Sequence, residues 1–149
     1  MDVKPVPKGY RRVTPYLMVP GVARLIDFLQ KAFGAKETQP RMARPDGTVM
    51  HAEVKIGDSI LMMGEPMGQF QAMPAAFCLY VRDTDAVYRR ALEAGATSIS
   101  EPADQFYGDR NAGVKDTAGN IWWIATRKED LSPEELARRA AEREQQAVH

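Results

Sequence analysis

The chain of 149 residues contains 20 Lys and Arg and 20 Asp and Glu, so its formal net charge is zero. Nucleic-acid-binding proteins and proteins of anionic membrane surfaces usually carry clustered basic residues, and neither partner is therefore expected. With 44% hydrophobic and 27% charged residues, the composition is that of one globular domain spanning residues 1–149. A single cysteine, no signal-peptide pattern and no long apolar run predict a cytoplasmic protein without internal disulfides.

In chain order, the first half predicts a strand, a helix and three further strands. The first strand is expected over residues 13–19, the helix over 22–33, and the later strands over 36–43, 49–56 and 59–64. The helix prediction rests on apolar residues at helical spacing, followed by Gly34 as a helix-ending residue. These apolar residues are Val22, Leu25, Ile26, Leu29 and Phe33. Residues 65–75 show no periodicity and are expected to form a loop.

The second half predicts the same order of elements. A strand over residues 77–82 leads into a helix with Asp83 as its N-cap and Gly95 after its end. Strands follow at 97–100, 106–114 and 121–126, with Gly108 as a candidate bulge position. A separate C-terminal helix over residues 131–147 is predicted from Ser132-Pro133, an N-cap residue followed by proline at the first helical position.

The two halves match each other at a constant offset of 62 residues, which indicates an internal repeat. Leu17-Met18-Val19 corresponds to Leu79-Tyr80-Val81, and residues 56–62 correspond to residues 118–124. The repeat defines two βαβββ modules, residues 12–64 and 76–127. The predicted fold class is therefore α+β, with two βαβββ modules and a helix added at the C-terminus.

Five motifs carry a resemblance to a known family. They are Val13-Thr14-Pro15-Tyr16-Leu17, Phe33-Gly34-Ala35, His51-Ala52-Glu53, Tyr107-Gly108-Asp109-Arg110 and Asp116-Thr117-Ala118-Gly119-Asn120-Ile121-Trp122. With these motifs the chain resembles the vicinal oxygen chelate superfamily of glyoxalase I, bleomycin-binding proteins and extradiol dioxygenases, and within it the PhnB-like branch. The resemblance implies that the strands curl into a cup for a ligand or metal. It also implies a homodimer, which would cover the strands at the edges of the cup.

In metal-dependent members of the superfamily, the first and last strands of each module supply the metal ligands. The resemblance places Thr14, Leu61, Ala76 and Trp123 at these positions. They lack the nitrogen, carboxylate and thiolate donors that divalent ions need. The only histidines are His51 and His149, and His149 ends the charged tail. We therefore expect no cofactor and no divalent metal, with a site built from carboxylates alone as the remaining alternative.

Strand alternation predicts which side chains line the cup. The expected ligand-binding residues are Tyr16, His51, Met63, Cys78, Tyr107, Arg110 and Trp123. An aromatic cavity that contains methionine suits a hydrophobic or planar small molecule.

Several of these residues also have a purely structural interpretation. His51 is a candidate acid or base, or a strand histidine paired with a carboxylate. Trp123 stacks on a ligand or fills the space of a lost metal, and Cys78 is a ligand contact or a buried structural cysteine. Arg110 clamps an anionic group of a ligand, or pairs with Asp109 or Glu101.

Three functions remain open from the sequence. The first is a metal-free module that binds a small hydrophobic or aromatic compound in the cup. The second is a glyoxalase-like isomerase or lyase, or a dioxygenase-type enzyme, that uses a non-standard site with His51 as the candidate catalytic residue. The third is a dimeric structural or interaction protein whose cup is filled by its own side chains.

Overall fold

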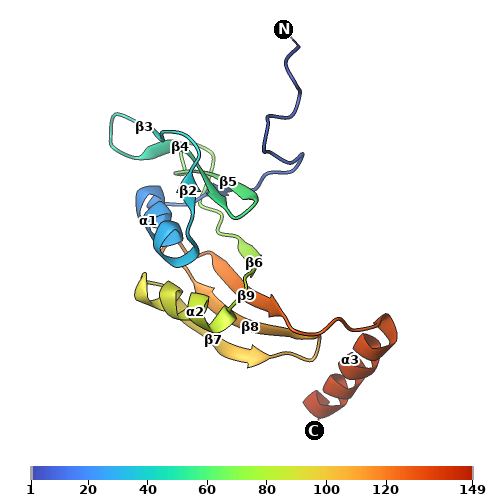
Figure 1. The fold of residues 1–149 in the computed structure, drawn as a ribbon. Helices are drawn as coiled ribbons and strands as arrows, with labels where there is room; N and C mark the ends of the chain where they lie inside the picture. The colour runs from blue at the N-terminus through green and yellow to red at the C-terminus, as the bar shows by residue number, and fades with distance from the viewer. Residues whose placement is uncertain (1, 149) are drawn as a thin grey trace.

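Two mixed sheets, each covered on one side by a helix, form the body of the protein (Figure 1). The computed structural model describes residues 2–148. The predicted position of His149 in the charged tail lies outside the described residues. The first sheet has the order β1 (Tyr16–Met18), β5 (Ser59–Gly64), β4 (Val49–Ile56) and β2 (Lys36–Glu37), and β3 (Met42–Ala43) also pairs with β4. The second has the order β6 (Ala76–Tyr80), β9 (Ile121–Arg127), β8 (Asp109–Lys115) and β7 (Thr97–Asp104).

The two modules repeat the same topology. In each, the first strand pairs in parallel with the last, β1 with β5 and β6 with β9, and the remaining pairs are antiparallel. The helices are α1 (Val22–Phe33), α2 (Thr84–Glu93) and α3 (Pro133–Val148). This arrangement confirms the predicted α+β class with a C-terminal helix. Within residues 2–148, no helix is both long and apolar enough to cross a membrane.

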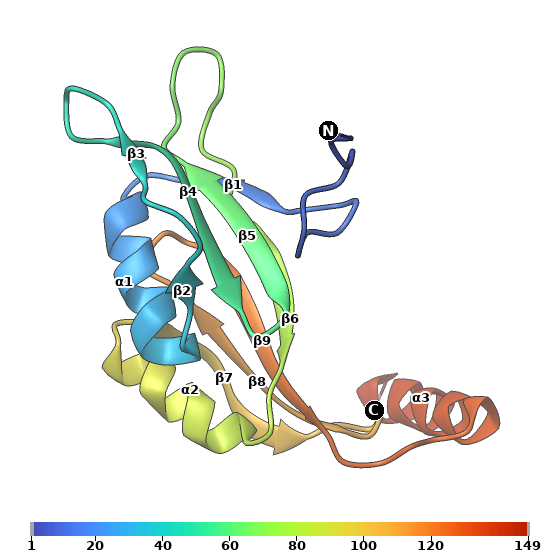
Figure 2. The ribbon, with the colours of Figure 1, turned by 45° about the horizontal axis from the view of Figure 1, so that its top comes forward.

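Helices α1 and α2 lie side by side on one side of the two sheets, and both modules contribute to one hydrophobic core (Figures 1 and 2). Trp122 of β9 is at the joint. Its ring centroid lies 4.9 Å from that of Phe33 at the end of α1 and 4.5 Å from that of Phe77 in β6. Aromatic pairs of this kind add to the free energy gained by burying their area.

The turn between β8 and β9 is held together by the carboxylate of Asp116. Oδ1 accepts hydrogen bonds from the backbone N–H groups of Ala118 (2.8 Å) and Asn120 (3.0 Å). Oδ2 accepts from the Asn120 side chain at 2.9 Å and from Trp122 Nε1–H at 2.8 Å. Asn120 is fully buried and in turn accepts from the N–H of Ala75. The Asp116–Trp122 motif is therefore explained by the structure of this turn.

The boundaries of several elements differ from the prediction because of proline and turn residues. The strand expected over residues 36–43 is interrupted at Pro40, which has no N–H to donate, and only β2 and β3 remain of it. The strand expected from residue 106 begins at Asp109. Gly108 has a φ of 96° and closes a turn on Gln105, so it lies in a turn and not in a bulge.

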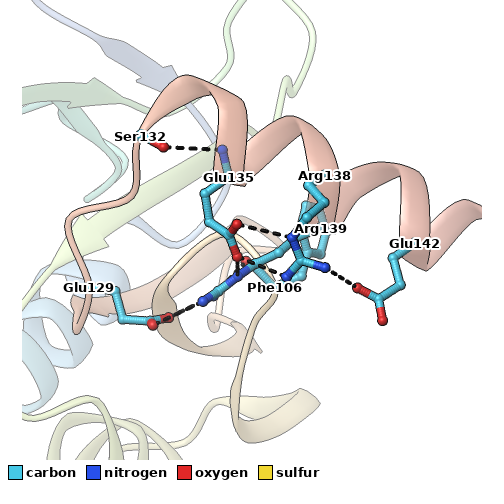
Figure 3. Close-up of polar contacts among 7 residues, drawn as sticks. All are labelled: Phe106, Glu129, Ser132, Glu135, Arg138, Arg139 and Glu142. Carbon is cyan, nitrogen blue, oxygen red and sulfur yellow. Dashed lines mark hydrogen bonds and ion pairs between the residues drawn. The ribbon is translucent and has the colours of Figure 1, made fainter.

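Helix α3 extends from the end of the second sheet (Figure 2). Ser132 Oγ accepts from the N–H of Glu135, which confirms the predicted N-cap (Figure 3). Arg139 forms ion pairs with Glu129 and Glu135 and donates to the backbone oxygen of Phe106. These contacts tie the helix to the segments on either side of β8 and β9, although each exposed ion pair alone contributes little stability.

Candidate functional site

Both sheets turn one face to the helices and leave the other face open within the described residues. Large side chains remain exposed on these open faces: Tyr16 is 47% exposed on the first sheet, and Tyr80 is 64% and Trp123 37% exposed on the second. Exposed aromatic residues gathered on a concave surface are typical of binding sites. The candidate site therefore consists of the two open faces.

On the first sheet, Tyr16, His51 and Glu53 form a chain of hydrogen bonds. His51 Nε2 lies 3.1 Å from Glu53 Oε1, and His51 Nδ1 lies 3.2 Å from the Tyr16 hydroxyl oxygen. A carboxylate only accepts hydrogen bonds, so Nε2 carries the proton on the Glu53 side. In the neutral ring Nδ1 then accepts from the Tyr16 hydroxyl. The predicted pairing of a strand histidine with a carboxylate is confirmed.

Glu53 is a buried carboxylate with three hydrogen-bond donors. Besides His51, the hydroxyl groups of Tyr10 and of Thr38 (3.2 Å) donate to its Oε2 atom. Burial by itself raises the pKa of Glu53, but the hydrogen bonds from Tyr10, His51 and Thr38 together outweigh it and hold the pKa below its usual value. The same contact with Glu53 raises the pKa of Tyr10. The carboxylate is therefore kept ionised inside the first module.

A groove of about 290 Å³ lies beside this chain on the first sheet. It is lined by Tyr16, Met18, Arg44, Met50, Gly64, Glu65, Met67 and Phe70. A Cβ atom on Gly64 would stand 2.5 Å from the backbone oxygen of Met50 and 3.0 Å from the Tyr16 hydroxyl. Glycine at this position thus leaves room for the Tyr16 hydroxyl to reach His51.

The second sheet carries a larger groove of about 490 Å³. Its lining consists of Cys78, Tyr80, Ser100, Gln105, Tyr107, Asp109, Asn111 and Trp123. The Trp123 ring lies over Gly113, because a Cβ atom there would stand 2.4 Å from Cζ3 of the ring. The Tyr80 hydroxyl donates to Asp109 Oδ2 at 3.2 Å. Aromatic rings and one carboxylate therefore meet in this groove.

The negative charge of Asp109 affects the acidic groups around it. It is the main cause of the raised pKa of Tyr80. Burial is the main cause of the raised pKa values of Cys78 and Tyr107, and Asp109 adds to both. The Cys78 residue as a whole is exposed, so the interpretation as a buried structural cysteine is wrong, but partial desolvation of the thiol raises its pKa and keeps it in the neutral form.

Two residues predicted to line the cup, Leu61 and Met63, are instead in the core. Leu61 is paired with Val54 and Met63 with Ala52 and Leu17, all of which are buried under the helices. The open-face position on β5 is taken by Met62, which pairs with Tyr16 as Trp123 pairs with Cys78. The repeat is therefore shifted by one residue in this strand, and such a shift moves every side chain to the other face.

Arg110 forms ion pairs within the second module and does not line the groove of the second sheet. Its guanidinium group binds both carboxylate oxygens of Asp85 on α2, at 2.6 and 3.0 Å, and Asp104 of β7 at 3.1 Å. The predicted partners Asp109 and Glu101 are thus wrong, although the predicted structural role is confirmed. With its donors directed at two carboxylates, Arg110 is not available to clamp an anionic ligand.

The positions that the resemblance assigned to metal ligands border two different grooves. Thr14 and the mostly buried Leu61 border a groove between the modules, whereas Trp123 lies in the groove of the second sheet. Replacing Leu61 by its neighbour Met62 adds only a thioether, a poor ligand for hard divalent ions. Among the described residues, no group of three or more His, Cys, Asp or Glu side chains is arranged to hold a metal ion.

Strand alternation along β4 and β6 also predicts Glu53 and Tyr80 on the side of the cup, two residues from His51 and Cys78, and the structure places both on the open faces. Asp109 lies in a strand whose register the sequence left open. Sequence reasoning missed Tyr10, which lies before the first module. Tyr10 gave no such signal, because its contact with Glu53 spans 43 residues and depends on the path of a loop.

The fold and the sequence place the chain in a known family. The family model for the glyoxalase/bleomycin resistance protein/dioxygenase superfamily matches residues 11–124. The chain belongs to this superfamily, which confirms the predicted resemblance at the level of the superfamily.

Relatives and solved structures agree with this assignment. Uncharacterized proteins of Mycobacterium bovis and Mycobacterium tuberculosis are 33% identical over 135 residues, which cover 83% of this chain and 88% and 79% of theirs. TioX from Micromonospora is 22% identical, with a TM-score of 0.62 over 82% of this chain and 100% of its own. A glyoxalase-related enzyme from Fulvimarina pelagi has a TM-score of 0.64 at 16% identity, over 78% of this chain and 88% of its own. At these identities the structures support the fold alone.

The Tyr10–Glu53 contact predicts a pH-dependent contribution to stability. Because the folded-state pKa of Glu53 is lowered, its ionised form stabilises the fold above the unfolded pKa, about 4.3, and this contribution is lost as the pH falls through the folded-state value. We expect Tyr10→Phe to lower the free energy of unfolding by about 1–3 kcal/mol at pH 7, and by less below about pH 4. Urea unfolding at both pH values measures this.

Tyr88→Phe is the matched control, because the Tyr88 hydroxyl donates to the neutral hydroxyl of Ser98. Its effect is expected to be small and independent of pH. An equal loss at both pH values for Tyr10→Phe would show that the Glu53 carboxylate does not depend on this hydrogen bond.

Proposed function

We propose that the protein binds a small aromatic or hydrophobic compound, without a metal, on the open faces of its two sheets. The observation that carries this proposal is the group of exposed rings, Tyr80, Tyr107 and Trp123, around the groove of the second sheet. The methionines Met18, Met50 and Met67 beside the first groove add adaptable apolar surface. The donor set at the family's metal positions supports binding without a metal.

A ligand in the second groove would contact Trp123, and this predicts a fluorescence response. The chain has two tryptophans, and Trp122 is buried in the core, so Trp123 is the one within reach of a ligand. We expect a panel of small aromatic compounds to include members that quench the emission, and Trp123→Leu to weaken their binding about tenfold or more in calorimetry.

Tyr88→Leu removes an aromatic ring from α2, outside both grooves, and is expected to leave binding unchanged. Absence of any signal across a broad panel at millimolar concentration, by fluorescence and calorimetry, would contradict the proposal. It would leave the third interpretation, a structural or interaction protein.

We further propose that a second copy of the chain completes the binding site. The two grooves share no lining residue and lie on different sheets, so each has the wall of one sheet only. Open grooves bury less of a ligand than the enclosed pockets usual for small molecules. A symmetric dimer that brings two open faces together would supply the missing wall and cover exposed Tyr16, Tyr80 and Trp123.

The dimer proposal predicts a mass of twice the 16.6 kDa chain in light scattering at micromolar concentration. A negative charge introduced on an open face should weaken the assembly, so Tyr80→Glu is expected to shift the mass toward that of one chain. Lys31→Glu on the outer surface of α1 is the control and should not change it. A strict monomer for the unmodified chain would contradict the proposal.

The motifs also support placing the chain in the PhnB-like branch of the superfamily. Three of them lie in the first module, namely Val13-Thr14-Pro15-Tyr16-Leu17, Phe33-Gly34-Ala35 and His51-Ala52-Glu53. In this interpretation Tyr16, His51 and Glu53 are features of the branch as well as of the hydrogen-bonded chain.

One observation favours an enzyme as a second candidate function. The Tyr16–His51–Glu53 chain connects an exposed hydroxyl to a buried carboxylate through an imidazole. Such an arrangement orients a histidine for proton transfer, with the carboxylate stabilising the charged ring. Tyr16 would touch the substrate, and His51 would receive the proton from its hydroxyl.

Proton exchange tests this candidate without knowledge of the substrate. Small α-hydroxy carbonyl compounds in D₂O should exchange their α-protons faster with the protein than without it, and His51→Gln should abolish the increase, as followed by proton NMR. Lys31→Gln, on the exposed surface of α1 and outside both grooves, serves as the control. An unchanged rate with His51→Gln would show that the chain of hydrogen bonds is structural.

A further inference from the structure

We propose that the groove of the second sheet recognises organic cations, an ammonium or other positively charged nitrogen carried on an aromatic or alkyl group. This inference rests on the proposed binding function and names the ligand class for one of its two grooves. It derives from a buried carboxylate that lacks a basic partner and from the aromatic rings around it.

Asp109 is a buried acid whose charge is not balanced by the protein. Its residue is 9% exposed, and its carboxylate accepts one hydrogen bond, from the Tyr80 hydroxyl. Within residues 2–148, no Lys, Arg or His side chain forms an ion pair with it. Buried charges are normally paired, so an unpaired carboxylate that lines a groove calls for a positive partner.

Three arginines near the groove already have other partners. Arg127 lies opposite Asp109 in the strand register, but its guanidinium group binds Asp130 and the backbone oxygen of Glu129. Arg143 lies over the ring of Phe106 at 5.5 Å. Arg110, next to Asp109 in sequence, binds Asp85 and Asp104. Lys128 borders a neighbouring groove together with Asp109 but forms no ion pair with it within residues 2–148, so a bound ligand can supply the positive charge.

Three rings around Asp109 suit the same kind of ligand. Tyr80, Tyr107 and Trp123 all line the groove, and the face of a ring attracts a cation. Trp123 lies against Gly113 and is 37% exposed, so part of its ring is open to the groove. Small residues, Gly113 and Ala125, form the floor between the rings, since they pair with Trp123 and Tyr80 across the strands. A flat or compact group fits above this floor.

The other acidic groups in the groove, Cys78, Tyr80 and Tyr107, stay neutral and therefore need no positive charge from a ligand. Asp109 raises the pKa of Tyr80, and burial raises those of Cys78 and Tyr107. The shift of Tyr80, and the smaller part that Asp109 adds to the other two, reflect the negative charge of Asp109, which favours a cation and disfavours an anion. Tyr80, Tyr107 and Asp109 also border the groove that continues to Leu131 and Leu136 at the start of α3, so an apolar extension of the ligand has a place.

Three compounds with the same ring and different charge test the inference: benzyltrimethylammonium, benzyl alcohol and benzoate. Calorimetry with the full chain is expected to rank their affinities in this order. Asp109→Asn keeps the size of the side chain and an acceptor for the Tyr80 hydroxyl but removes the charge. It should weaken binding of benzyltrimethylammonium about tenfold or more and leave that of benzyl alcohol unchanged.

Asp27→Asn is the matched control, because it removes the same charge from the exposed surface of α1. It should leave all three affinities unchanged. Equal affinity for the cation and the alcohol, or equal weakening of both in a folded Asp109→Asn variant, would overturn the cation inference while the binding function stands. Failure of all three compounds, and of the wider aromatic panel, would overturn the binding function itself.

Discussion

Trp122 is the contact on which the arrangement of the two modules depends. Its ring packs between Phe33 at the end of α1 and Phe77 of β6, and its Nε1–H is fixed on Asp116 in the β8–β9 turn. This contact joins α1 to the second sheet, α1 packs against α2, and each sheet uses its helix-facing side for the shared core. The opposite sides remain for ligands or for another chain. The location of the candidate site thus follows from how the core is built.

The two open faces treat their buried carboxylates in opposite ways. Glu53 receives three donors, His51, Tyr10 and Thr38, and its ionised form is stabilised within the protein. Asp109 receives one, from Tyr80, and stands among aromatic rings. A satisfied carboxylate needs nothing from a ligand, whereas an unpaired one gains from a positive charge brought to it. Repeats of the same topology have therefore diverged into faces with different chemistry.

A feature of the structure is predictable from the sequence when the residues that form it lie close together along the chain. The helical spacing from Val22 to Phe33 and the N-caps Asp83 and Ser132 are local, and the structure confirms them. The faces of Leu61 and Met63 were predicted wrongly, because the repeat shifts by one residue within β5 and only strand pairing reveals it. The partners of Arg110 and the contact of Tyr10 with Glu53 join distant segments, and no local pattern specifies them.

Equivalent places on the two open faces hold different groups. Tyr16, Met62 and Glu53 lie in one row across the first sheet, and Cys78, Trp123 and Gly113 lie in the corresponding row of the second. Glu53 and Gly113 thus occupy equivalent places. A side chain at residue 113 would displace the Trp123 ring, whereas Glu53 beside the flexible Met62 meets no such obstacle. In the first sheet, Glu53 supports the hydrogen-bonded chain with His51 and Tyr16. In the second sheet, Gly113 leaves room for the Trp123 ring, and the aromatic groove therefore forms there.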